Sequence, residues 1–307
     1  MPFFTVVIPL YNKEKYIGKT LVSALSQTFT DFEVLIINDS STDKSLEAVQ
    51  KFTDNRIKII QHPVNKGLSA SRNTGIKNAS AEYIAFLDAD DVWKPKFLQK
   101  IYGLISSYPE AGLFATEYLE VYPNGVSITH NFKLNTGVVN NFFEAGLKQP
   151  IYCPSALCVK KSILDKTGLF NENITFGEDI DFSIRANLLY KLAYYNQPMV
   201  LYTMQSENQI TQSPITGKVI TDFDFYEQRY PTRKDLKKYL DFNRYIIAKK
   251  YNEAGNKSGY REMIKNIDKK NLNSIQRLLL AMPGFVLRSI KVLKAKLVKS
   301  GINPTTY

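Results

Sequence analysis

Three carboxylates stand within four positions directly after a short apolar run. Residues 83–87 have the composition of a buried strand, and Asp88, Asp90 and Asp91 follow it in the sequence DADD. Like charges crowded at a strand end repel one another, so a bound cation would stabilise them. Asp88 and Asp90, two apart in an extended segment, point the same way, whereas Asp91 points elsewhere. The D-x-D pair predicts a site for a divalent cation that binds nucleotide phosphates, although an acidic loop can produce the same spacing.

A second acidic pair lies in the sequence FGEDIDF. Glu178 and Asp179 stand where a helix is expected to begin, because Ile180, Ile184 and Leu188 continue an apolar face after them. Carboxylates in the first turn of a helix complement its dipole, which is one interpretation of the pair. The other is that one of them acts as a general base toward a substrate hydroxyl. The spacing alone leaves both interpretations open.

The elements that must position these carboxylates alternate in the way that a parallel sheet requires. Four apolar, strand-like runs occur early in the chain, and segments with helical spacing separate them. The runs cover residues 4–10, 32–39, 56–62 and 83–87, and helices are expected within 13–27, 41–52 and 63–79. This order predicts an α/β fold with an open, doubly wound, mostly parallel sheet flanked by helices.

The carboxyl ends of the four predicted strands all carry polar side chains. Ligands of open α/β sheets bind outside these ends. The ends read PLYN from Pro9, NDSS from Asn38, HPVNK from His62 and DADD from Asp88. Turn and cap chemistry accounts for any one of them, but four polar ends on one edge favour a ligand site.

Taken in order, these motifs resemble the family-2 glycosyltransferases of GT-A fold. The segments that carry the resemblance are PLYN, NDSSTD, NKGLSASRNTG, DADD and GEDIDF, and they cover about residues 4–205. The set is specific in this order, whereas no single motif is. The resemblance implies a GT-A (Rossmann-like) catalytic domain over residues 1–215, with a nucleotide-binding half at 1–92 and an acceptor half at 93–215.

The resemblance also implies a nucleotide pocket. The first two strand ends would hold the nucleoside, with Pro9, Tyr11 and Asp39 at the base. Asn65 and Arg72 would belong to the same pocket, with Arg72 near the diphosphate or the base. Each assignment has a structural alternative: Asn65 can stand in a plain turn, and Arg72 can lie across a helix surface.

The reaction implied by the resemblance is an inverting transfer of a sugar from a nucleotide-sugar donor, with a UDP-sugar expected. Asp88 would contact the ribose, and Asp90 would bind Mn²⁺ or Mg²⁺, which offsets the charge that grows on the leaving phosphate. Asp179 would be the catalytic base that takes the proton of the acceptor hydroxyl, and Glu178 would hold the donor sugar or the acceptor. The expected acceptor is a glycan or a lipid-linked acceptor in cell-surface polysaccharide synthesis.

One departure from the family pattern concerns the metal. Many members carry a His shortly after the Leu-Tyr run, where it can help to hold the metal or the diphosphate. Here the segment VLYTMQSENQIT offers Gln205, Ser206 and Asn208 instead, which leaves the remaining metal ligands undefined. The two histidines, His62 and His130, lie elsewhere, and a structural role is expected for His62 at its strand end.

The positive charge of the chain is concentrated at its C-terminal end. The net charge is +11, and residues 221–307 hold 19 Lys and Arg against 8 Asp and Glu, which accounts for the whole excess. We expect residues 216–307 to form a helical basic extension. Near its end Val286, Ile290, Leu293 and Leu297 are predicted on one helical face. The basic residues predicted around the other face are Arg288, Lys291, Lys294, Lys296 and Lys299.

This last helix and the composition bear on location. A basic amphipathic helix can lie on an anionic membrane surface, or it can pack on the catalytic domain with its lysines in solvent. Cys153 and Cys158 match no zinc or redox pattern and suit a reducing compartment. With no signal peptide or spanning segment expected, the hypothesis is a cytoplasmic protein, peripheral at the inner face of the cell membrane.

Two other function classes stay open on the residues alone. A sugar nucleotidyltransferase would need a Gly-rich, basic phosphate loop after the first strand, and PLYNKEKY contains no glycine. A basic protein that binds nucleic acid without catalysis would interleave basic and aromatic side chains, whereas the apolar face of the last helix is aliphatic. We therefore expect no nucleic-acid partner.

Overall fold

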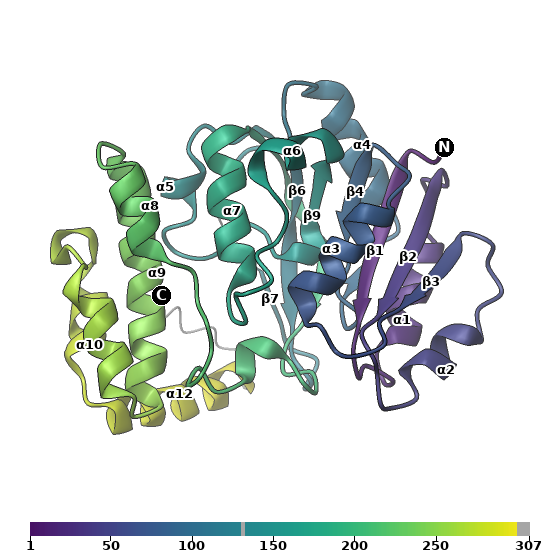
Figure 1. Ribbon diagram of the computed structural model, residues 1–307. Helices are drawn as coiled ribbons and strands as arrows, with labels where there is room; N and C mark the ends of the chain where they lie inside the picture. The colour runs from purple at the N-terminus through teal and green to yellow at the C-terminus, as the bar shows by residue number, and fades with distance from the viewer. Residues whose placement is uncertain (130–132, 300–307) are drawn as a thin grey trace.

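The structure is a computed structural model, and it describes residues 1–129 and 133–299. The strands in this part of the chain are β1 (Phe4–Leu10), β2 (Phe32–Asn38), β3 (Ile57–Gln61), β4 (Tyr83–Phe86), β5 (Val92–Trp93), β6 (Leu113–Val121), β7 (Ser127–Thr129), β8 (Gly137–Val138), β9 (Leu157–Lys160) and β10 (Leu192–Thr203). They form one sheet in the order β3-β2-β1-β4-β9-β6-β10-β5, with β7 beside β6 and β8 beside β10 (Figure 1). The predicted open α/β sheet is confirmed.

The N-terminal half of the sheet follows the predicted alternation of strands and helices. Its helices are α1 (Ile17–Leu25), α2 (Ser45–Gln50) and α3 (Leu68–Asn78). The first four strands pair in parallel. Every residue of β1 and β2 is buried, as expected for a parallel sheet covered on both faces, and this explains their continuous apolar runs. The carboxyl ends of these strands therefore lie at the same edge of the sheet.

Beyond β4 the sheet becomes mixed. β9 is antiparallel to both of its neighbours, β4 and β6, whereas β6 and β10 are parallel to each other. β5 begins directly after Asp91 and pairs antiparallel with β10, where Trp93 lies opposite Val200. The chain thus turns back at the acidic strand end, and this turn brings the end of β10 beside it.

The remaining helices complete the fold. Those before residue 190 are α4 (Phe97–Ser107), α5 (Phe142–Ala145), α6 (Leu164–Thr167) and α7 (Glu178–Leu189). The C-terminal ones are α8 (Phe223–Arg229), α9 (Lys234–Glu253), α10 (Lys257–Lys265), α11 (Ser274–Ala281) and α12 (Gly284–Lys299). The predicted helical character of the extension is confirmed.

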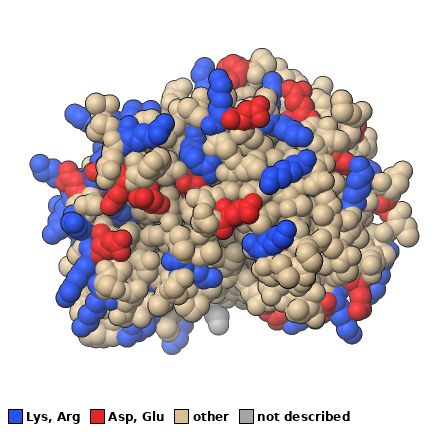
Figure 2. All heavy atoms as spheres, in the orientation of Figure 1, with Lys and Arg blue, Asp and Glu red and all other residues tan. Residues whose placement is uncertain are grey.

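The helix α9 joins the C-terminal helices to the rest of the protein. Leu236, Tyr239 and Leu240 on α9 are buried in the same apolar core as the sheet. Phe242 and Tyr245, further along α9, belong to a second core shared with α11 and α12. In Figure 1 these helices stand beside the sheet at the end opposite β3, and Figure 2 shows Lys and Arg gathered along this side of the molecule.

The structure corrects the predicted apolar face of α12. Leu287 is buried in the second core, and Ile290 packs against it, because this side of α12 contacts α9. Leu293, which was predicted on the same face as Ile290, is 57% exposed. The buried side of the helix is therefore turned relative to the prediction, and the side chain of Lys299 lies outside the described residues. Among the helices of the described chain, none is both long and apolar enough to cross a bilayer.

Candidate active site

A cavity of about 910 Å³ lies at the carboxyl ends of β1, β2 and β4. The start of α7 and one side of α9 form its other walls. The structure brings all nine predicted site residues to this cavity: Pro9, Tyr11, Asp39, Asn65, Arg72, Asp88, Asp90, Glu178 and Asp179. The expected gathering of distant motifs is therefore seen, while the role of each residue stays a prediction.

Arg72 connects the two acidic motifs. Its side chain is buried, with Nη2 donating to Asp88 Oδ1 at 2.9 Å and Nη1 donating to Glu178 Oε1 at 2.7 Å. The helix α3 that carries Arg72 lies tight on β1, where a Cβ on Gly75 would stand 2.2 Å from Val7 Cγ1. The alternative that Arg72 lies across a helix surface is wrong, because the guanidinium joins the strand end to the start of α7.

The three carboxylates of the DADD motif each have a different partner. Asp88 faces Arg72, and Asp90 faces Lys13 with its Oδ2 2.7 Å from Nζ. Asp91 points away from the cavity, where it accepts hydrogen bonds from Ser155 Oγ at 2.5 Å and from the Thr203 amide at 2.8 Å. Asp91 thus points elsewhere than Asp88 and Asp90, as predicted. Separate partners explain how three carboxylates are tolerated at one strand end.

Burial changes the proton affinity of two of these groups. The pKa of Asp88 is raised, because burial outweighs the favourable charge of Arg72. The pKa of Asp91 is raised well above its ordinary value, first by burial and then by the charges of Asp90 and Asp88. Through its hydrogen bonds to Ser155 and Thr203, Asp91 has a structural role in which it joins the turn to the end of β10. Asp88 and Asp90 line the cavity.

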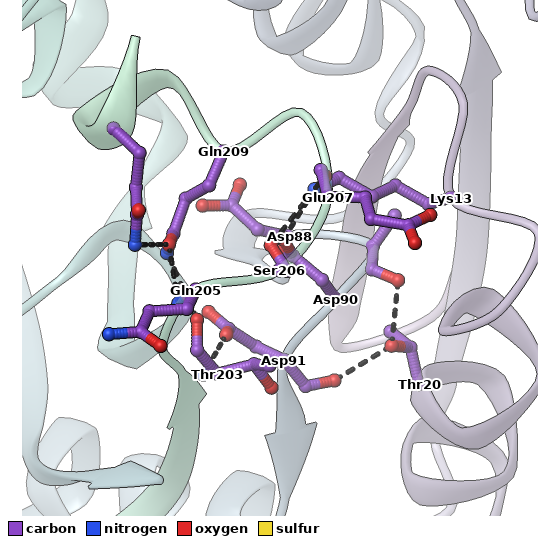
Figure 3. A network of polar contacts seen from close by, with 12 residues as sticks. Lys13, Thr20, Asp88, Asp90, Asp91, Thr203, Gln205, Ser206, Glu207 and Gln209 are labelled. Carbon is purple, nitrogen blue, oxygen red and sulfur yellow. Dashed lines mark hydrogen bonds and ion pairs between the residues drawn. The ribbon is translucent and has the colours of Figure 1, made fainter. Parts of the chain in front are cut away.

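Lys13 is a site residue that the sequence did not single out. Besides Asp90, its ammonium donates to the Glu207 carbonyl oxygen at 2.6 Å and to Ser206 Oγ at 3.1 Å (Figure 3). Ser206 Oγ in turn donates to Asp90 Oδ2 at 2.5 Å. These contacts fix the segment after β10 across the acidic strand end. A signal was available, because Lys13 directly follows the polar PLYN strand end.

The segment after β10 has two residues with positive φ angles on either side of Ser206 and Glu207. Gln205 and Asn208 have φ angles of 61° and 58°, in the left-handed region that costs energy for residues other than Gly. The side chain of Gln209 supports this turn, with Nε2 donating to the Thr203 carbonyl and Oε1 accepting from the Gln205 amide (Figure 3). Ser206 is therefore held at Asp90 by the local backbone as well as by Lys13.

Asp39 organises the opposite wall. Its carboxylate accepts hydrogen bonds from the amides of Lys66 and Gly67, both at 2.8 Å. His62 Nδ1 lies 2.7 Å from Asp39 Oδ1, and Nε2 lies 2.9 Å from Thr74 Oγ1, so this histidine has the structural contacts expected of it. Gly67, with φ of 90°, turns the chain into α3. The other histidine, His130, lies outside the described residues.

Asp179 stands in the first turn of α7 but differs from its neighbours. Glu178 is bound by Arg72, and Asp181 is bound by Arg185 at 2.6 Å. Within the described chain Asp179 forms no ion pair, and it faces the cavity. Burial, followed by the charge of Glu178, raises the pKa of Asp179 to about 6, although Arg72 opposes the shift. A carboxylate with this pKa is suited to general-base chemistry near neutral pH.

The acidic end of the cavity offers hard oxygen ligands to a cation. Among the described residues no group of three or more His, Cys, Asp and Glu side chains is arranged to hold a metal. Mg²⁺ and similar ions are nevertheless often held by one or two carboxylates together with substrate phosphates and waters. Asp90 and the hydroxyl of Ser206 fit such a site, in which the substrate itself supplies further ligands.

The wall formed by α9 was not predicted. Tyr239, Phe242, Ile246 and Ile247 line the cavity, and Phe176 lies before the acidic pair on the same side. From the sequence we predicted this helix only as part of a basic extension, because the segment is rich in lysine. The spacing of Tyr239, Phe242 and Ile246 is that of a helix face, but it cannot indicate which partner that face contacts.

Comparison with known proteins identifies the family. The family model described as Glycosyl transferase family 2 matches residues 5–168, more than half of the chain. The chain belongs to this family. The matched region contains the polar ends of the first strands and the DADD motif, so the resemblance inferred from the motifs is confirmed. Family membership favours sugar transfer over the sugar nucleotidyltransferase and the basic nucleic-acid-binding protein.

Several curated proteins are similar to this chain in sequence. An uncharacterised glycosyltransferase of Haemophilus influenzae is 29% identical over 213 residues, covering 66% of this chain and 66% of that protein. The Escherichia coli protein WfaP, named UDP-Glc:alpha-D-GlcNAc-diphosphoundecaprenol beta-1,3-glucosyltransferase, is 31% identical over 192 residues, covering 62% and 72%. The minor teichoic acid biosynthesis protein GgaA of Bacillus subtilis is 30% identical over 189 residues, covering 58% and 42%. The chain thus spans less than half of GgaA and about two thirds of the Haemophilus protein.

Solved structures share the fold over nearly the whole chain. S. aureus TarS in complex with UDP-GlcNAc has a TM-score of 0.65 at 20% identity, covering 97% of this chain and 90% of that chain. The mannosyltransferase PcManGT from Pyrobaculum calidifontis, in complex with GDP-Man and Mn²⁺, has a TM-score of 0.59 at 17% identity, covering 96% and 80%. The predicted GT-A fold is confirmed by this likeness.

Proposed function

We propose that this protein is an inverting, metal-dependent glycosyltransferase that moves a sugar from a UDP-sugar to a hydroxyl of a glycan or lipid-linked acceptor in cell-surface polysaccharide synthesis. The observation that carries the proposal is that Asp90 and Asp179 line the same cavity, where Arg72 joins their neighbours Asp88 and Glu178. We assign residues 1–92 to donor binding, residues 93–215 to the acceptor half, and residues 216–307 to the extension.

The donor site is proposed at the strand ends. Pro9, Tyr11 and Asp39 would surround the base, and Asn65 and Arg72 would complete the nucleotide pocket. The choice of UDP is supported by relatives, because the name of WfaP specifies UDP-Glc and TarS is solved with UDP-GlcNAc. PcManGT is solved with GDP-Man instead, so the family fold itself accommodates other nucleotides.

The chemical step is proposed at the start of α7. The acceptor hydroxyl attacks the anomeric carbon of the donor sugar while the bond to the nucleoside diphosphate breaks on the opposite face. Asp179 takes the hydroxyl proton, and a pKa of about 6 leaves it ionised and able to do so at neutral pH. Glu178 would hold the donor sugar or the acceptor, since Arg72 fixes the direction of its carboxylate.

The leaving group is proposed to depart at the acidic strand end. Asp88 would contact the ribose, and Asp90 with Ser206 would hold Mn²⁺ or Mg²⁺ beside the diphosphate. A divalent ion bound there supplies positive charge to the leaving phosphate. Lys13 lies at the same carboxylate, so the protein adds a fixed cation of its own on this side.

A lipid-linked acceptor would place the protein at the inner face of the cell membrane. The support is the name of WfaP, which specifies a diphosphoundecaprenol acceptor, and the surface of α12, where Phe285 and Leu293 are exposed among lysines. We propose that this exposed side of α12 rests on the anionic surface of the membrane.

The proposed chemistry is tested by following UDP release from a panel of UDP-sugars with the purified protein. Asp179→Asn is expected to lower the turnover by about 10²–10⁴-fold, the range for loss of a general base, while UDP still binds. Asp165→Asn is the matched control, because Asp165 is also in a first helical turn but does not line the cavity. Equal turnover of the Asp179→Asn variant and the wild type would contradict the assignment.

A further inference from the structure

The helix α9 forms an apolar wall of the cavity, with one lysine at the end of this wall. Phe242, Ile246 and Ile247 present aromatic and aliphatic side chains to the cavity, and Lys250 lines it one turn further along the helix. The residues contributed by the strand ends are mainly polar and acidic, so the two sides differ in chemistry. A ligand that fills both sides needs an apolar part and an anionic part on the α9 side.

Lys250 lies beside the segment that precedes the proposed base. Its Nζ stands 5.3 Å from the ring centroid of Phe176, which precedes Glu178 by two positions and Asp179 by three. The ammonium donates to the Thr211 carbonyl oxygen at 3.3 Å. Thr211 belongs to the segment after β10, so Lys250 joins α9 to the same segment that Lys13 holds at the other end.

The cation of Lys250 has no carboxylate partner in the described part of the chain, and Lys218, which also lines the cavity, forms no ion pair there either. Lys13 and Arg72, the cations of the strand-end side, are both paired with carboxylates. Burial lowers the pKa of Lys250, and the nearby Lys291 adds to this, while Glu253 opposes it. A partly buried cation without a counter-ion is costly, so an anionic ligand at this place would be stabilised.

We propose that Lys250, assisted by Lys218, binds a phosphate group of the acceptor, and that the apolar face of α9 contacts the lipid to which this phosphate is joined. The acceptor class is then a sugar linked through a phosphate or diphosphate to a lipid. This inference rests on the proposed function and deepens it by assigning the acceptor side. Lys250 is a binding residue that touches the acceptor away from the reacting atoms.

The test is a calorimetric titration of decyl diphosphate, below its micelle concentration, into the full-length protein saturated with UDP and Mn²⁺. Saturation with UDP keeps the probe out of the donor diphosphate site. Wild type is expected to bind the probe, and Lys250→Met to bind it about tenfold or more weakly, as expected for loss of a hydrogen bond to a charged group. Lys250→Arg keeps the charge and is expected to restore most of the affinity.

Lys249→Met is the matched control. Lys249 is the preceding residue of α9, but its Nζ lies over the ring of Tyr245 at 5.0 Å and it does not line the cavity. Binding of decyl diphosphate by this variant is expected to equal that of wild type. Inorganic pyrophosphate and decanol, each carrying one part of the probe, are both expected to bind more weakly than decyl diphosphate.

Three outcomes would overturn the inference. Equal affinity of Lys250→Met and wild type would remove Lys250 from the site, and equal affinity for pyrophosphate and decyl diphosphate would remove the lipid from the ligand. Displacement of UDP by decyl diphosphate would show that the probe occupies the donor site. In all three cases UDP binding itself persists in the absence of the probe, whereas failure of the proposed function would appear as loss of UDP binding in the wild type.

Discussion

The two sides of the cavity balance charge in different ways. On the strand-end side, Asp88 and Glu178 share Arg72, and Asp90 faces Lys13. On the α9 side, aromatic and aliphatic residues surround Lys250, which has no carboxylate partner among the described residues. The strand-end side is thus preorganised by internal ion pairs, whereas the α9 side leaves a charge for a ligand to neutralise. The difference suggests that the two substrates are selected by different physical means.

The strongest test of the preorganised side is Arg72→Met. Removal of one partner from a buried ion pair leaves uncompensated charges, here Asp88 and Glu178, and is expected to cost about 3–5 kcal/mol of unfolding free energy. Urea denaturation measures this cost. Arg233→Met is the control, because its pair with Asp235 lies at the surface and is expected to contribute about 1 kcal/mol or less. Similar losses for the two variants would show that the bridge does not organise the site.

The pH dependence of sugar transfer tests whether Asp179, with its raised pKa, is the base. Its pKa is raised to about 6, so Asp179 is protonated below that pH and ionised above it. A base must be ionised, and turnover at saturating substrate is therefore expected to fall about tenfold per pH unit below pH 6 and to level off above it. A profile that stays flat down to pH 5 would exclude Asp179 as the base. Asp165→Asn should leave the profile unchanged.

The smallest expected effect concerns the segment held at Asp90. Ser206→Ala removes the hydrogen bonds that Ser206 Oγ donates to Asp90 and accepts from Lys13, while the ion pair between Lys13 and Asp90 stays. The unfolding free energy is therefore expected to fall by about 1 kcal/mol. Ser106→Ala, at an exposed position of α4, is the control. Urea denaturation of both variants decides whether Ser206 contributes to the network or only lies beside it. Equal stability of Ser206→Ala and wild type would contradict the contribution.

The strand-end side was predictable because its signals are local. Each polar end directly follows an apolar run, and parallel strands bring such ends to one edge, so the sequence alone places Asp39, Asp88 and Asp90 near one another. The link between Arg72 and Glu178 is different, since the residues are 106 positions apart. The resemblance to a family placed both residues in one site, but neither the resemblance nor the spacing predicted the ion pair between them.

The α9 side could not be predicted for a physical reason. A helix with apolar residues at helical spacing indicates that one face is buried, but it does not identify the partner of that face. The face of α9 with Tyr239 packs on α5 and on the cavity, and the other face packs on α11 and α12. The predicted buried face of α12 was wrong for the same reason, since Leu287 is buried and Leu293 is exposed.

The central claim is that the acidic strand end binds a nucleoside diphosphate together with a divalent ion. It is tested most directly by calorimetric titration of UDP into the wild type and Asp90→Asn, each with Mn²⁺ and with EDTA, and with GDP and CDP as competitors. We predict that UDP binds the wild type only with Mn²⁺, in preference to GDP and CDP, and that Asp90→Asn loses this binding while circular dichroism shows it folded. Equal binding of UDP in EDTA, or by the folded variant, would contradict the claim.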